Sequence, residues 1–210
     1  MLDETMENDL DAVYAELMTN HEREAVKNLL AVFVVFNQLK RIADQAKNLC
    51  EETIFAVSGE TKTPKVYNIL FLDEDNSCQS QMAAAIARKN FPGSGHYTSG
   101  GRYPAATLNA AMRQFLDGHG VSLEDGAKPA PLAMTPLQLA SKHVLVSLEG
   151  PVKSYFDPIP FHTVPLEWDV GPAPRDGDAA DGNKRLEELY REIAVHVRDL
   201  MELLRGEQAH

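Results

Sequence analysis

The densest group of reactive side chains in this chain lies in one short segment, residues 73–80. Its members are Asp73, Glu74, Asp75, Asn76, Ser77, Cys78, Gln79 and Ser80. Carboxylates such as Asp73 and Asp75 could hold a divalent cation, because hydrated Mg²⁺ is typically bound through one or two carboxylates. They could equally form a solvated acidic loop. Cys78 could be a reactive thiol if its pKa were lowered, or a small buried side chain that supports the loop.

The residues on either side indicate what positions this segment. VYNILFL at 66–72 is a short apolar run, which is typical of a buried strand. MAAAIARKNF at 82–91 has a helical composition. The segment therefore joins a strand to the amino terminus of a helix, where N–H groups and the helix dipole favour an anion. In parallel α/β sheets, ligands bind beyond the carboxyl ends of the strands.

The rest of the chain alternates between the two kinds of element. HYTS (96–99), HVLVSL (143–148) and HTVPL (162–166) are predicted strands. ATLNAAMRQFLDGHG (106–120) and KRLEELYREIAVHVRDLMELL (184–204) are predicted helices, with a loop rich in glycine, proline and aspartate before the second. This alternation predicts a three-layer α/β domain with a four-stranded parallel sheet.

The first 60 residues have a helical composition, with no proline and one glycine, Gly59. They predict a long helical hairpin of residues 4–19 and 22–58, with Asn20 as a cap and Gly59 ending the second helix. Apolar residues recur at steps of three and four: Leu29, Phe33, Phe36, Leu39, Ala43, Ala46, Leu49 and Thr53. Two helices cannot bury both faces of such a stripe, so we expect a homodimer with a four-helix arrangement.

Composition narrows the classes of partner. The formal net charge of −11 argues against nucleic acid and anionic membrane surfaces. The longest apolar run, residues 29–36, is too short for insertion into a bilayer. The acidic amino terminus is unlike a secretory signal, and two cysteines form no disulfide framework. We therefore expect a cytoplasmic protein with reduced thiols, in which Cys50 packs on its helix.

The segment 66–205 resembles low-molecular-weight protein tyrosine phosphatases and thioredoxin-coupled arsenate reductases. Their motif hhFhCxxNxCRSPMAEA matches here at Phe71, Asn76, Cys78, Ser80, Met82 and Ala83. YTSGGRYPAATLNAAMRQFLDGHGVSL resembles the family's second strand and helix, and LASKHVLVSL resembles its third strand. Glu167–Trp168 lies where the family places its acid loop. The resemblance implies the fold of that family.

The departures from the family's pattern concern its catalytic residues. The nucleophilic cysteine falls on Asp73, the phosphate-binding arginine on Gln79, and the general-acid Asp-Pro on Gly171-Pro172. Leu148 stands where an arsenate reductase would need a resolving cysteine. Because the thiolate and the arginine are both replaced, we assign no catalytic residue and no cofactor, and we expect a non-catalytic regulatory or scaffold protein.

Two enzymatic readings stay open. One is a phosphatase or arsenate reductase relative that uses Asp73 and Asp75 with a divalent cation. The other is an aspartyl-phosphate mechanism, since FLDEDNS is similar to the first-strand loops of haloacid-dehalogenase-like phosphatases and receiver domains. A receiver needs an aspartate after the third strand, where Glu149 stands. A dehalogenase-like enzyme needs an acidic pair, for which only Asp178 and Asp181, in a loop, are available.

The segment LAVFVVFNQLKRIADQAKNLCEETIFAVSGE, from Leu30, resembles the last helix of a PhoU-type repeat. PhoU proteins carry an E-x-x-x-D pattern that binds metal. Here Lys40 stands at the glutamate position, while Asp44 and Asn48 remain on the same face of the helix. Asp44 is therefore a third candidate metal ligand. The expected organisation is a dimerisation module at 1–60, a linker at 61–65 and the phosphatase-like domain at 66–210. Such a protein could act with a protein partner in a phosphate or arsenate response.

Overall fold

The structure is a computed structural model that describes residues 23–59, 65–160, 162–174 and 179–206. The chain divides into two compact units. One unit contains helix α2 (Arg23–Ser58) and the short helix α5 (Pro136–Ala140). The other contains the sheet and the remaining helices.

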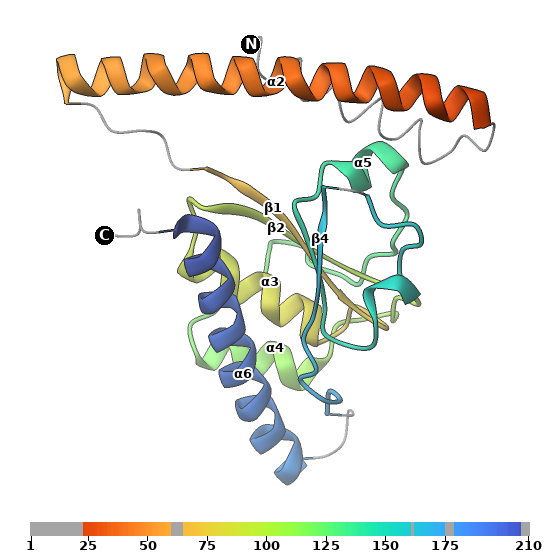
Figure 1. Ribbon diagram of the computed structural model, residues 1–210. Coiled ribbons are helices and arrows are strands. Elements are labelled where there is room, and N and C mark those ends of the chain that lie inside the picture. The colour runs from red at the N-terminus through yellow and green to blue at the C-terminus, as the bar shows by residue number, and fades with distance from the viewer. Residues whose placement is uncertain (1–22, 60–64, 161, 175–178, 207–210) are drawn as a thin grey trace. The chain divides into compact units, whose positions relative to one another are not determined.

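The sheet has four strands, all parallel, in the order β2-β1-β3-β4 (Figure 1). Their bounds are β1 Tyr67–Asp73, β2 Gly95–Gly101, β3 Val144–Ser147 and β4 Val164–Glu167. In register, Phe71 of β1 lies opposite Ser99 of β2 and Val146 of β3. The predicted α/β class and the four-stranded parallel sheet are confirmed.

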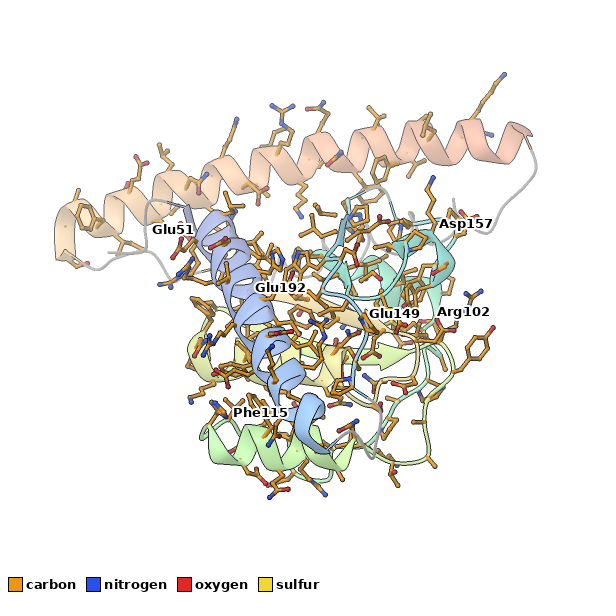
Figure 2. All side chains as sticks on the ribbon, turned by 90° about the horizontal axis from the view of Figure 1, so that it is seen from below. Glu51, Arg102, Phe115, Glu149, Asp157 and Glu192 are labelled. Atoms are coloured by element: carbon orange, nitrogen blue, oxygen red, sulfur yellow. The ribbon has the colours of Figure 1, made fainter. Side chains whose placement is uncertain are left out.

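Three helices lie together on one side of the sheet: α3 (Gln79–Asn90), α4 (Ala110–Gly118) and α6 (Ala179–Arg205) (Figure 1). Helix α3 contacts β1, β2 and α6, and α6 also contacts α4. Figure 2 shows Phe115 on α4, whose ring meets that of Tyr190 on α6 with centroids 5.7 Å apart. Ile69 and Phe71 of β1 join this core.

Both faces of the central strand are buried. Leu70 and Leu72 point away from Ile69 and Phe71, because side chains alternate along a strand, and all four are almost fully buried. This explains why β1 reads as a continuous apolar run rather than an alternating one.

One helix begins later than the sequence indicates. The predicted helix at 106–120 is α4, Ala110–Gly118, because Asn109 has extended backbone and its side chain accepts from the Met112 N–H at 2.8 Å. Gly120, with a φ of +63°, turns the chain after it. Helix α5 and the 3₁₀ turn η1 (Val152–Ser154) were not predicted.

Helix α2 agrees with the prediction for residues 22–58. It ends where Gly59 adopts a φ of +72° and donates its N–H to Phe55 O at 2.8 Å. The predicted first helix, with its Asn20 cap, lies outside the described residues. Cys50 is exposed, so the expectation that it packs is wrong. None of the described helices has both the length and the hydrophobicity to span a bilayer.

Candidate functional site

The loop between β1 and α3 lies where the strand order reverses. From β1 the chain proceeds to β2 on one side, and later to β3 on the other. The carboxyl ends of β1 and β3 therefore flank a topological switch point, the usual ligand position in such sheets. The two loops are joined there, because Glu74 N–H donates to the Glu149 carboxylate at 3.2 Å.

Asp73 ends β1 with its side chain turned into the loop, and only 2% of the residue is exposed. One carboxylate oxygen accepts from Asn76 N–H at 2.5 Å and the other from Ser80 N–H at 2.9 Å. Burial raises the pKa of Asp73 from 3.8 to about 6, against the opposite effect of the bonds from Ser80 and Asn76. Two backbone N–H groups of the loop thus donate to a carboxylate of the same loop.

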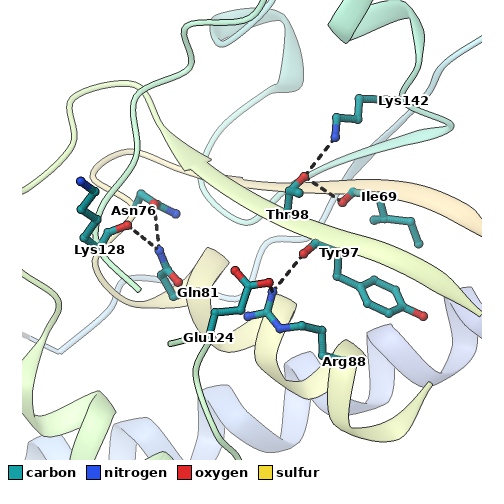
Figure 3. Close-up of polar contacts among 9 residues, drawn as sticks. All are labelled: Ile69, Asn76, Gln81, Arg88, Tyr97, Thr98, Glu124, Lys128 and Lys142. Carbon is teal, nitrogen blue, oxygen red and sulfur yellow. Dashed lines mark hydrogen bonds and ion pairs between the residues drawn. The ribbon is translucent and has the colours of Figure 1, made fainter. Parts of the chain in front are cut away.

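Asn76 organises the inside of the loop and is fully buried. Its Oδ1 accepts from Gln81 Nε2 at 2.9 Å and from Ala130 N–H at 2.8 Å, and its Nδ2 donates to Ser80 Oγ at 2.7 Å. Figure 3 shows the bond from Gln81. The residue has a φ of +53°, a left-handed conformation that asparagine tolerates better than most residues.

The outer part of the loop is held through its backbone. Glu74 O accepts from Tyr103 N–H and Asp75 O from Ala105 N–H, both at 2.8 Å. A Cβ on Gly101 would lie 2.6 Å from the backbone nitrogen of Asn76, so only glycine fits there. The carboxylates of Glu74 and Asp75 are exposed, and Asp75 accepts from the N–H of Ser77 at 2.8 Å.

Gln79, where the resembled family has arginine, does not point its amide to solvent. Its Nε2 donates to the carbonyl of Gly171, in the segment that the resemblance gives to the general acid. Two further side chains hold this segment: Arg185 donates to the carbonyls of Val170 and Pro172, and Asn109 to that of Pro174. The segment 170–174 is thus fastened from three elements.

Two contributors to the site have no signal in the sequence. Arg185 is half-buried on α6, and nothing in its spacing along that helix marks it. Tyr155 donates its hydroxyl to Glu149 O at 2.5 Å. Burial raises the pKa of Tyr155 to about 12, and the charges of Asp73, Glu149 and Glu74 add to that rise. Tyr155 therefore belongs to the acidic surroundings of Asp73.

Cys78 and Trp168 serve packing. Cys78 precedes α3 and is 1% exposed within the core, which fits a supporting side chain. Trp168 is also buried, with its ring 5.8 Å from that of Phe71 and 5.1 Å from that of His196. Neither group is presented to solvent.

The three candidate metal ligands are distributed over both compact units. Asp73 lies in the buried interior of the loop, Asp75 is exposed, and Asp44 is on α2 in the other compact unit. Within the described ranges, no three His, Cys, Asp or Glu residues are arranged to hold a metal ion.

Comparisons with solved structures identify the fold. The thioredoxin-dependent arsenate reductase Cg_ArsC1' of Corynebacterium glutamicum is 18% identical, with a TM-score of 0.52, and the match covers 93% of this chain and 82% of that one. An arsenate reductase in the phosphate binding state is 18% identical, with a TM-score of 0.54, over 66% of this chain and 98% of that one. The low-molecular-weight protein tyrosine phosphatase SP-PTP of Streptococcus pyogenes is 12% identical, with a TM-score of 0.53, over 68% and 95%.

These similarities define an α/β protein with the fold of low-molecular-weight tyrosine phosphatases and arsenate reductases, preceded by a long helix. No protein-family model matches the chain, and no curated protein matches it. At these identities the similarity concerns the fold alone.

Proposed function

We propose that this protein is a catalytically inactive relative of the phosphatases and arsenate reductases whose fold it shares, and that it acts as a regulatory or scaffold protein. The observation that carries the proposal is that the side chain of Asp73 is buried and hydrogen-bonded within the loop. Its carboxylate accepts the N–H groups of Asn76 and Ser80 inside the loop. A carboxylate in that position is a poor replacement for a thiolate, and it repels an incoming oxyanion.

The neighbouring residues support the same conclusion. A phosphatase of this fold needs a fixed positive charge to bind phosphate oxygens, and the planar guanidinium of arginine suits that role. Here the amide of Gln79 is bonded to Gly171 instead. The exposed carboxylates of Glu74 and Asp75 add negative charge at the same edge of the sheet. A role in a phosphate or arsenate response follows from the resemblances of the two parts of the chain, as an association.

Lack of turnover is the first expected result. Purified protein at pH 5 to 8 should hydrolyse p-nitrophenyl phosphate no faster than buffer, and should not reduce arsenate with thioredoxin, with or without Mg²⁺. The reason is that Asp73 and Gln79 stand where this fold would need a thiolate and an arginine. Turnover that rises with Mg²⁺ and disappears in Asp73→Ala would reject the proposal in favour of an acidic-loop enzyme. The S. pyogenes phosphatase is a suitable positive control for the assay.

We also propose that α2 pairs with a second copy of the chain. Five apolar side chains on one face of α2 are exposed, with fractions from 42% to 70%: Val32, Val35, Leu39, Ile42 and Leu49. The first four are separated alternately by three and four residues, the spacing of a coiled-coil seam. Such a seam is completed by another helix of the same pattern, and a second copy provides one.

The oligomeric state tests this pairing. Light scattering at micromolar concentration should give about twice the 23.2 kDa of one chain. The double variant Leu39→Glu/Ile42→Glu should halve that mass, because it places charges in the seam. Leu203→Glu, at an 82% exposed position of α6, is the matched control and should stay a dimer. A wild-type mass of one chain would contradict the proposal.

A further inference from the structure

A hollow of about 400 Å³ lies beside the start of α4, outside the candidate loop. One wall is formed by residues 106–108 and the exposed side of α4, and the other by residues 127–129. None of the residues Asp73–Ser80 lines it. The volume is within the range of small-molecule sites. The hollow has no part in the function proposed above for the loop.

The charge of the hollow is opposite to that of the protein. Arg113 on α4 and Lys128 on the opposite wall contribute two positive charges, and Asp117 contributes one negative charge. The chain as a whole has 31 acidic and 20 basic residues, excluding histidine. Within the described part of the chain, neither the Arg113 guanidinium nor the Lys128 ammonium bonds to another side chain. Both cations remain available to a ligand.

The uncharged residues of the lining indicate what the rest of the ligand should be like. Ala106, Leu108, Ala127 and Pro129 provide apolar surface, and Gln114 and Thr107 provide neutral hydrogen-bonding groups. Arginine binds carboxylate and phosphate through a planar fork, and lysine adds a point charge. We propose that the hollow binds a small organic anion, with its carboxylate or phosphoryl group at Arg113 and Lys128 and an apolar body against the alanine and proline surface.

The chain segments that form this hollow are hydrogen-bonded, through residues next to the lining, to the candidate loop. On one side, the lining residue Lys128 accepts at its carbonyl from Gln81 Nε2 of α3 at 3.3 Å (Figure 3), and the nearby Ala130 N–H donates to Asn76 Oδ1. On the other side, Asn109 lies between the lining residues Leu108 and Ala110, and its N–H donates to Ser77 O at 3.0 Å. A ligand that draws the walls together acts on the loop through Asn76 and Ser77. We therefore expect binding at the hollow to be coupled to the state of the loop, and by linkage the state of the loop to alter the affinity of the hollow.

The test is a titration of the full chain followed by amide NMR shifts. The probes are phenyl phosphate and benzoate as the two kinds of anion, inorganic phosphate as an anion without an apolar body, and benzylamine as a cation of similar size. At least one aromatic anion should saturate with shifts at residues 106–117 and 127–129, and which one does so separates a phosphoryl from a carboxylate ligand. Benzylamine and inorganic phosphate should bind at least tenfold more weakly.

Variants decide whether the two cations do the binding. Arg113→Gln and Lys128→Gln should each raise the dissociation constant of the better anion at least tenfold. Arg191→Gln, an exposed cation on α6 paired with Glu187, is the matched control and should leave it unchanged. Because all three side chains are exposed, folding should not be affected. Equal binding of benzylamine, unchanged affinity in both variants, or shifts confined to Asp73–Ser80 would each overturn the inference.

Discussion

Replacing Asn76 by alanine is expected to lower the free energy of unfolding by at least about 4 kcal/mol. The side chain makes three buried hydrogen bonds, to Ser80 Oγ, Gln81 Nε2 and Ala130 N–H. Each partner left without a bond loses its solvation without compensation, which costs about 1–3 kcal/mol where burial is complete. Alanine must in addition adopt the positive φ of this position, at a cost of about 1–2 kcal/mol. Urea unfolding at neutral pH measures the sum.

Two further variants separate these contributions. Asn76→Gly removes the same hydrogen bonds but accepts the positive φ, so it should be about 1 kcal/mol more stable than Asn76→Ala. Asn90→Ala, at an exposed position at the end of α3, is the control and should change stability by less than about 0.5 kcal/mol. If Asn76→Ala costs no more than Asn90→Ala, the buried network contributes nothing and the account of the loop is wrong.

The sequence predicted the sheet because its signals are local. The apolar run before Asp73 and the helical composition after Met82 are each continuous over the length of one element, and the parallel direction of the strands follows from the alternation of strands and helices. The late start of α4 was missed because residues 106–109 have helix-compatible composition, and only the bond from Met112 N–H to Asn109 Oδ1 reveals the cap. Pattern alone could not exclude an earlier start.

The candidate site was predicted only as a segment. Asp73 and Gln79 were identified because a motif aligns them with a cysteine and an arginine. What each side chain bonds to depends on distant segments: Gln79 on Gly171, and Asn76 on Ala130. Arg185 and Tyr155 contact the site from segments far along the chain. Local sequence patterns do not predict such long-range contacts. The pKa of Asp73 likewise depends on its burial, and three adjacent acidic residues in a sequence do not show which of them is buried.

Asp73 should make the protein more stable in mild acid. In the folded state its pKa is about 6, compared with 3.8 for the ordinary side chain. Between these two pH values the folded state binds the extra proton, so the contribution of Asp73 to the free energy of unfolding falls as pH rises from about 4 to 6. A shift of roughly two units corresponds to about 3 kcal/mol, which is present near pH 4 and lost above pH 6.

Other carboxylates titrate in the same range, so the measurement is a comparison with Asp73→Asn. Asparagine keeps the shape and does not titrate. Urea unfolding at pH 4, 5, 6 and 7 should show that wild type gains about 3 kcal/mol on the variant between pH 7 and pH 4. A constant difference would mean that the folded pKa is ordinary, and a wild-type loss toward acid would mean that the bonds from Asn76 and Ser80 outweigh burial. In either case the folded protein would not disfavour the ionised form of the Asp73 carboxylate. The expected gain instead means that the loop holds a negative charge at neutral pH and is relieved of it below pH 6, the range in which an external oxyanion would meet least repulsion.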